Sequence, residues 1–260
     1  MTAEPSPPPG RGLLDGKVVV VTAGAGAGIG SAVAERCLAE GARVVLSDSH
    51  ERRLAETRER LTEAYGKRVW SLSCDVTNED AVRALVTGAA GEYGRLDVMI
   101  NNAGLGGNRP VTEMTDGEWA RVLDVTLTGT FRCTRAALQQ MIAQGGGGAV
   151  VNNASVLGWR AQAGQAHYAA AKAGVMAFTR CAALEVAGHG IRVNAVAPSL
   201  AAHPYLSKVI GEEELAGLAR REAFGRAAQP WEVATVVAFL ASDYASYLTG
   251  EVISVSSQHP

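Results

Sequence analysis

The sequence predicts a single α/β domain built on a doubly wound sheet of seven parallel strands with helices on both faces. Short runs of apolar, β-branched residues alternate with longer stretches of helical periodicity along the chain. The first run, VVVVT at 18–22, is apolar almost throughout, as in a strand that is buried on both faces. No linker divides the 260 residues, a length that one α/β domain can reach.

The alternation defines the expected elements in order. Strands are expected at 18–22, 43–47, 69–74, 96–101, 149–153, 191–196 and 252–255. Helices are expected at 31–40, 51–65, 79–93, 116–144, 166–187, 212–221 and 231–241. Gly41 suits the C-cap of the first helix, and the glycines at 145–148 end the fourth. The proline-rich residues 1–11 are predicted to form a disordered tail, so the domain covers 12–260.

Composition disfavours several classes of function. The net charge of −2 gives no electrostatic footprint for a nucleic acid or an anionic membrane. No apolar run approaches the roughly 20 residues that span a bilayer, and the start of the chain lacks a signal-peptide pattern. The four cysteines are widely spaced without a CxxC pair, so we expect no metal site. A reducing cytoplasm is the expected location.

A glycine-rich loop follows the first strand and opens the first helix. It contains Gly24, Gly26, Gly28, Ile29 and Gly30. Glycine is needed where a backbone turns tightly, approaches a pyrophosphate, or packs a helix close to a strand. The amides at the start of the helix would face the phosphates. The loop therefore predicts a Rossmann-type dinucleotide site.

Further cofactor residues are expected where other strands end, because open α/β sheets bind ligands there. Asp48 ends the second strand, where a carboxylate can accept hydrogen bonds from an adenosine ribose and repel the 2′-phosphate of NADP. NAD is therefore the expected cofactor and NADP the less favoured one, although Arg52 and Arg53 lie nearby. The remaining expected cofactor residues are Asp75, Val76, Asn102, Ala103, Gly104, Pro198 and Leu200, with Tyr168 and Lys172.

The chain resembles the short-chain dehydrogenase/reductase family from about residue 13 to residue 255. The resemblance rests on the glycine loop, on Asn-Asn-Ala-Gly at 101–104, on Ser155, and on Tyr-Ala-Ala-Ala-Lys at 168–172. It implies that Ser155, Tyr168 and Lys172 are catalytic, and that Lys172 also contacts the nicotinamide ribose. Family members usually carry Asn where this chain has Thr126, and that Asn helps to hold a proton-relay water. Thr126, at that position, is therefore the fourth candidate catalytic residue.

The residue types suit this chemistry. Tyr168 and Lys172 are four residues apart on an expected helix and share one face. A free phenol has a pKa of roughly 10, and a nearby ammonium should lower it. Tyr168 would then exchange a proton with an alcohol or carbonyl oxygen, and Ser155 would hydrogen-bond that same oxygen.

The substrate is expected to contact loops beyond the strand ends. The candidate residues are Leu105, Val156, Leu157, Trp159, Gln162 and Ser199. This mostly apolar lining suits a bulky or alicyclic group, although Trp159 is equally compatible with a role as a core anchor. Arg109, Arg160 and Lys208 are candidate contacts for CoA phosphates, with solvated surface charge as the alternative.

Stretches at 152–160, 223–228 and 258–260 resemble a narrower group of the family, which oxidises a ring hydroxyl of CoA-linked intermediates of steroid breakdown with NAD. A CoA thioester is thus the expected substrate. The alternatives are a 3-oxoacyl-CoA or acyl-carrier-protein reductase, such as an acetoacetyl-CoA reductase, and a non-enzymatic NAD-binding scaffold. The resemblance also implies a homotetramer.

Overall fold

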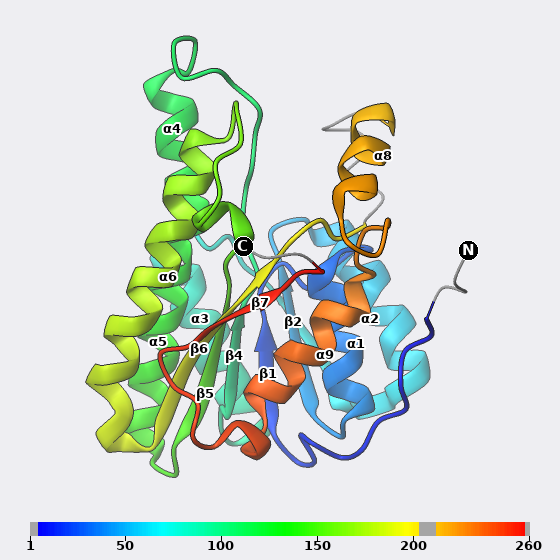
Figure 1. Ribbon diagram of the computed structural model, residues 1–260. Coiled ribbons are helices and arrows are strands. Elements are labelled where there is room, and N and C mark those ends of the chain that lie inside the picture. The colour runs from blue at the N-terminus through cyan, green and yellow to red at the C-terminus, as the bar shows by residue number, and fades with distance from the viewer. Residues whose placement is uncertain (1–4, 203–211, 258–260) are drawn as a thin grey trace.

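Seven parallel strands form one sheet in the order β3-β2-β1-β4-β5-β6-β7 in the computed structural model, which describes residues 5–202 and 212–257 (Figure 1). The strands are β1 (Val18–Val21), β2 (Arg43–Asp48), β3 (Val69–Ser73), β4 (Val98–Asn101), β5 (Gly148–Asn153), β6 (Ile191–Pro198) and β7 (Val252–Val255). The predicted fold class is confirmed, and each strand starts and ends within two residues of its expected position.

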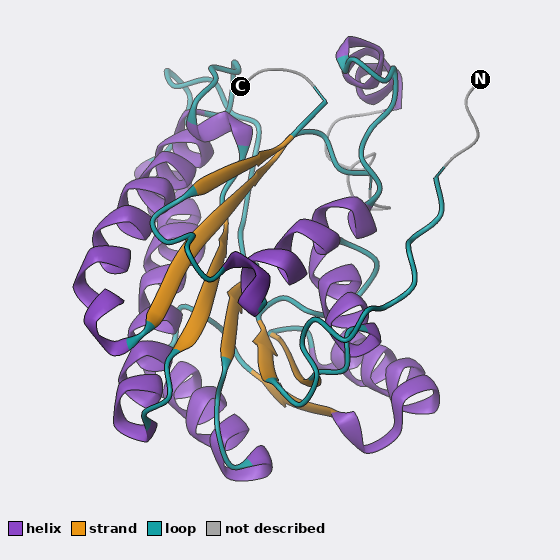
Figure 2. Ribbon diagram, turned by 60° about the horizontal axis from the view of Figure 1, so that its bottom comes forward, coloured by secondary structure: helices purple, strands orange, loops and turns teal. Residues whose placement is uncertain are grey.

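Helices cover both faces of this sheet (Figure 2). They are α1 (Ile29–Ala39), α2 (Glu51–Tyr65), α3 (Glu79–Tyr93), α4 (Asp116–Leu123), α5 (Gly129–Gln144), α6 (Ala166–Val186), α8 (Glu212–Arg221) and α9 (Pro230–Ala241). Val19 and Val21 of β1 pack with α1, α2 and α9, whereas Val20 packs with α3, α5 and α6. This alternation explains why the central strands are apolar on both faces.

The expected helix at 116–144 contains a feature that the sequence does not predict. A single π-helical turn, Asp124–Thr128, joins α4 to α5. Gly129 follows the turn, where an added Cβ would lie only 2.7 Å from a methyl carbon of Val76. A π turn inside a helix often marks a functional site, and this one contains Thr126.

The start of the chain is tied to the domain before the first strand begins. Arg36 in α1 donates a hydrogen bond to the carbonyl oxygen of Pro8 and forms an ion pair with Glu40. The amide of Arg11 donates to the Glu40 carboxylate over 2.8 Å. The predicted boundary between a tail and a domain at residues 11 and 12 remains a prediction. Within the described ranges, no helix has the length and apolar character needed to cross a membrane.

A buried chain of polar side chains links the middle of the sheet to two helices. Asn101 of β4 donates to Thr134 of α5 and to Asn152 of β5, both over 2.8 Å. Asn152 in turn donates to Thr179 of α6 over 2.9 Å. Because these groups are buried, each hydrogen bond compensates a lost contact with water. The chain thereby holds α5 and α6 against the strands whose ends carry the candidate site.

We predict that Asn152→Ala lowers the free energy of unfolding by about 1–3 kcal/mol for each buried partner left unsatisfied. The measurement is chemical denaturation followed by circular dichroism. Asn108→Ala is the control, because Asn108 is exposed and its loss should change stability by no more than about 0.5 kcal/mol. Equal stability of the two variants would contradict this account of the polar chain.

Candidate active site

The glycine loop lies between β1 and α1, beside the point where the strand order reverses. The sheet grows from β1 toward β2 in one direction and toward β4 in the other, which creates a crevice at the carboxyl ends of β1 and β4. Gly26 has a φ of +85°, which favours glycine. An added Cβ at Gly28, the N-cap of α1, would meet nothing within 4 Å. The first amides of α1 are thus open to a phosphate group.

Gly30 has a different role in this loop. An added Cβ there would collide with the carbonyl oxygen of Ala23 and with Nδ2 of Asn102. Asn102 Nδ2 itself donates to the carbonyl oxygens of Thr22 and Ala23, over 3.2 and 3.1 Å. Gly30 therefore lets α1 pack directly on the ends of β1 and β4, as the third glycine of a dinucleotide loop does.

A cavity of about 760 Å³ opens at these strand ends. It brings together many of the residues that the sequence assigns to cofactor binding, namely Asp48, Asp75, Val76, Ala103 and Gly104. Leu105, a predicted substrate residue, also lines it. Pro198 and Leu200 are not part of its lining: Pro198 is buried at the end of β6, and the carbonyl of Leu200 accepts from the amide of Ala228 over 2.8 Å.

Asp48, the predicted ribose contact, lines this cavity at the end of β2. Its side chain is buried, and Oδ1 accepts a hydrogen bond from the amide of His50 over 2.9 Å. The guanidinium of Arg53 lies 3.4 Å from the same oxygen and also lines the cavity. Arg52, the other arginine in this stretch, is paired with Glu56 on the outside of α2. The cavity lining therefore fits a dinucleotide, and the negative charge of Asp48 within it is partly compensated by Arg53.

Ser155, Tyr168 and Lys172 come together beside this cavity. Ser155 follows β5 and accepts a hydrogen bond from the amide of Leu157 over 3.2 Å, which orients its hydroxyl. It also hydrogen-bonds the Tyr168 phenol. Tyr168 and Lys172 lie one turn apart on α6, with the Lys172 Nζ 5.5 Å from the centroid of the Tyr168 ring. Lys172 is buried and donates to the carbonyl oxygen of Asn153 over 2.5 Å.

Burial controls the proton affinity of both groups. It raises the pKa of Tyr168 to about 12, while the hydrogen bond with Ser155 acts in the opposite direction. Burial lowers the pKa of Lys172 to about 8. The sequence predicts that Lys172 lowers the pKa of Tyr168. In this structure that prediction is wrong for the net shift, because loss of solvation raises the pKa of Tyr168 by more than the hydrogen bond with Ser155 lowers it.

Thr126 has a structural partner that the sequence does not reveal. Its side chain is buried, and its hydroxyl accepts from the amide of Leu105 over 2.9 Å and donates to the carbonyl of Leu105 over 3.1 Å. An added Cβ on neighbouring Gly104 would lie 3.8 Å from this hydroxyl and 3.4 Å from the Lys172 Nζ. Thr126 thus clamps the loop after β4 next to the lysine.

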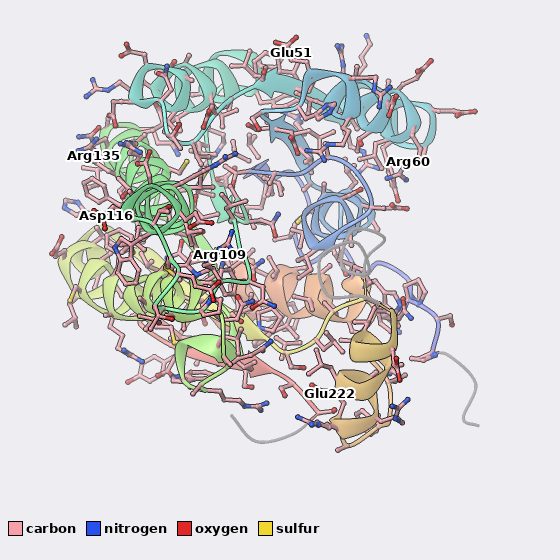
Figure 3. The ribbon with its side chains drawn as sticks, turned by 90° about the horizontal axis from the view of Figure 1, so that it is seen from above. Glu51, Arg60, Arg109, Asp116, Arg135 and Glu222 are labelled. Carbon is pink, nitrogen blue, oxygen red and sulfur yellow. The ribbon has the colours of Figure 1, made fainter. Side chains whose placement is uncertain are left out.

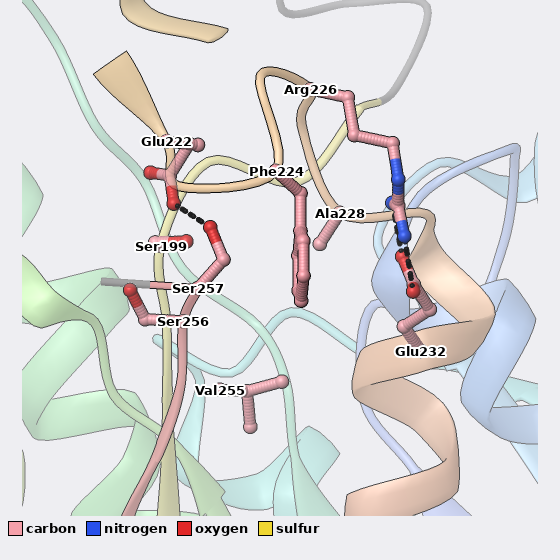
Figure 4. A pocket seen from close by; sticks show the side chains of 9 residues that line it. All are labelled: Ser199, Glu222, Phe224, Arg226, Ala228, Glu232, Val255, Ser256 and Ser257. Carbon is pink, nitrogen blue, oxygen red and sulfur yellow. Dashed lines mark hydrogen bonds and ion pairs between the residues drawn. The ribbon is translucent and has the colours of Figure 1, made fainter. Parts of the chain in front are cut away.

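The other predicted substrate residues lie in two places. Val156 is buried and Leu157 half-buried after β5, while Gln162 is exposed. Trp159 is 41% exposed, so it is not a core anchor. Ser199 lines a separate cavity of about 160 Å³ with Glu222, Phe224 and Val255 (Figure 4).

Two of the predicted CoA contacts can be placed in the structure. Arg109 projects over the carboxyl ends of the strands and is paired with Glu118 over 3.2 Å (Figure 3). Arg160 is half-buried, and Lys208 lies outside the described residues.

Comparisons with known proteins agree with this geometry. The family model described as enoyl-(acyl carrier protein) reductase matches residues 24–257. The chain is 64% identical over 251 residues, 96% of each chain, to the (5R,7aS)-5-hydroxy-7a-methyl-1-oxo-2,3,5,6,7,7a-hexahydro-1H-indene-carboxyl-CoA reductase of Mycobacterium tuberculosis. It is 38% identical over 243 residues to a 3-oxoacyl-(acyl-carrier-protein) reductase FabG of Vibrio cholerae, covering 94% of this chain and 97% of the relative. A crystal structure of a short chain dehydrogenase from Mycobacterium smegmatis is similar with a TM-score of 0.88 and 58% identity, over 98% of both chains.

A glycine loop at the switch point of a parallel sheet, together with these similarities over nearly the whole chain, leads to one conclusion: the chain belongs to the short-chain dehydrogenase/reductase family, a family of oxidoreductases that use nicotinamide cofactors.

Proposed function

We propose that this protein uses NAD to interconvert a ring hydroxyl and a ketone on a CoA-linked intermediate of steroid breakdown. The observation that carries the proposal is the cluster of Ser155, Tyr168 and Lys172 beside a cavity fit for a dinucleotide. The substrate class follows from the relative that is 64% identical, whose name specifies a bicyclic CoA thioester. Leu105, Val156, Leu157, Trp159, Gln162 and Ser199 remain the proposed substrate contacts.

The proposed mechanism assigns proton transfer to Tyr168. The bound nicotinamide would supply or accept the hydride. With its raised pKa, the Tyr168 phenol keeps its proton at neutral pH and suits donation to a carbonyl oxygen. The reverse direction, oxidation of an alcohol, requires the phenolate. Ser155 would hold the same substrate oxygen through its hydroxyl.

Lys172 would support both states of this phenol. Because its pKa is lowered only to about 8, the side chain keeps its positive charge at pH 7. That charge stabilises a phenolate when Tyr168 gives up its proton. The carbonyl of Asn153 holds the ammonium at the place where the nicotinamide ribose is proposed to lie.

The choice of NAD rests on Asp48. A buried carboxylate at the end of β2 would accept hydrogen bonds from ribose hydroxyls and would repel a 2′-phosphate. Arg53 weakens this repulsion because it is paired with the same carboxylate. The proposed cofactor contacts also include the glycine loop, Asp75, Val76, Asn102, Ala103 and Gly104. A homotetramer and a cytoplasmic location remain predictions.

Tyr168→Phe is predicted to lower kcat by roughly 10² to 10⁴-fold, because it removes the proton donor while keeping the ring. NADH affinity, measured by fluorescence titration, should stay unchanged. Tyr93→Phe is the matched control, since that phenol donates only to the carbonyl of Lys67 at the far end of α3. Unchanged turnover of Tyr168→Phe would refute the proposed proton transfer.

Asp48→Ala should reduce the preference for NAD over NADP, expressed as the ratio of the two kcat/KM values, by roughly tenfold or more. Both the lost hydrogen bonds to ribose and the lost repulsion of phosphate act in this direction. Glu51→Ala removes the same charge from an exposed site at the start of α2 and should leave the ratio unchanged. An unchanged ratio in Asp48→Ala would mean that another group selects the cofactor.

The proposed substrate class is tested by steady-state turnover of the wild-type protein. We expect a hydroxy-indanone acyl-CoA to be oxidised with NAD at a higher kcat/KM than 3-hydroxybutyryl-CoA. Both compounds carry CoA, so the difference reports on the ring. Turnover of the short acyl-CoA alone would instead support a 3-oxoacyl reductase, the function that the 38% identical relative represents.

A further inference from the structure

Three glycines after β4 lie against the beginning of α6. An added Cβ at Gly104 would lie 3.4 Å from the Lys172 Nζ, and one at Gly107 would lie 3.0 Å from Nε2 of His167. An added Cβ at Gly106 would lie 3.7 Å from Cδ2 and 3.9 Å from Cε2 of Tyr168. Residues 104–107, which we call the glycine strap, therefore run antiparallel to the first turns of α6, across the candidate catalytic groups.

Gly107, the last residue of the strap, is required by packing. A contact of 3.0 Å at Gly107 is tighter than ordinary side chains allow, and His167 is only 2% exposed, so it has little room to move. At Gly104 an added Cβ would lie 3.4 Å from the buried ammonium of Lys172, which is an ordinary van der Waals distance. A side chain at 107 would therefore displace His167.

Gly106 differs, because neither packing nor backbone conformation requires glycine there. The φ angle of Gly106 is not positive, so residues other than glycine can adopt its backbone conformation. Contacts of 3.7 and 3.9 Å are ordinary van der Waals distances. The residue is exposed. A side chain at position 106 would fill the space along the edge of the Tyr168 ring. This edge includes Cε2, the carbon next to the one that bears the hydroxyl.

The strap is also held in place, so this space has a fixed shape. The hydroxyl of Thr126 binds both the amide and the carbonyl of Leu105, in the middle of the strap. Beyond it, the amide of Arg109 donates to the carbonyl of Gly164 over 2.9 Å. The buried side chain of His167 packs against Gly107. A larger residue at 106 could not be accommodated by moving the strap away from Tyr168 without breaking these contacts.

We propose that Gly106 sets the upper limit on substrate bulk at the reacting carbon. Without a side chain at 106, the carbons that flank a secondary alcohol can lie beside the Tyr168 ring, and ring-bearing alcohols enter. The inference rests on the proposed function for the identity of Tyr168 as the proton donor, and it adds the residue that determines size. Thr126 and His167 act as positioning residues, since they hold the strap.

The test compares wild type, Gly106→Ala and Gly106→Leu on secondary alcohols of rising bulk: 2-butanol, cyclohexanol and decahydro-2-naphthol, with NAD. For Gly106→Leu we expect kcat/KM for the bicyclic alcohol to fall by roughly tenfold or more relative to that for 2-butanol. Gly106→Ala should give a smaller loss of the same kind. NADH affinity should be unchanged in both variants, which shows that the cofactor site is intact.

Gly91→Ala is the matched control, because Gly91 is exposed on α3 and an added Cβ there meets nothing within 4 Å. Equal losses for all three alcohols, or no loss, would overturn the proposal, as would failure of the wild type on both cyclic alcohols. Adding the hydroxy-indanone acyl-CoA separates the two claims. If the wild type oxidises decahydro-2-naphthol but not this thioester, the proposed substrate class is refuted. The role of Gly106 is then still tested by the three alcohols.

Discussion

The close packing of α1 on the ends of β1 and β4 is the constraint on which the rest of the site depends. Gly30 permits it, because any side chain there would collide with Ala23 and Asn102. Asn102 then ties the strands together: it donates to the carbonyls at the end of β1 and accepts from Asn153 over 2.9 Å. The carbonyl of Asn153 in turn holds Lys172. One continuous set of contacts therefore joins the glycine loop of the candidate cofactor site to Lys172.

Burial also determines the pKa values of Tyr168 and Lys172, at the lysine end of this set of contacts. It favours the neutral forms of both Tyr168 and Lys172, raising one pKa and lowering the other. Tyr168 and Lys172 therefore do not form a phenolate–ammonium ion pair in this structure. Lys172 retains its charge at neutral pH because its pKa stays near 8, and Asn153 provides a hydrogen-bond acceptor for the ammonium. The phenol and the ammonium are thus both available in the protonation states that donation to a carbonyl requires.

Much of the fold could be predicted because it depends on local patterns. Helices α2 and α3 begin and end where the sequence predicts, since His50 and Asn78 cap their starts and glycines follow their ends. Tyr168 and Lys172 share a face because of their spacing alone. The π turn at Asp124–Thr128 could not be predicted, because one wider turn leaves the apolar periodicity of a long helix nearly intact. The clamp between Thr126 and Leu105 joins residues 21 positions apart, and the raised pKa of Tyr168 depends on burial, so both required the tertiary structure.

The residues assigned to proton transfer are positioned by local structure, whereas the loop that faces them is positioned by tertiary contacts. The groups assigned to proton transfer lie on α6 and directly after β5, where regular structure fixes them. The strap that faces them has no side chain at three of its four positions, so it cannot fix its own shape by packing. Its position comes from Thr126 in the π turn and from His167 beside Tyr168. On the proposal that Gly106 limits substrate bulk, these two buried residues help to set the space available to a substrate without contacting it, and a change at either one is expected to alter the set of accepted alcohols.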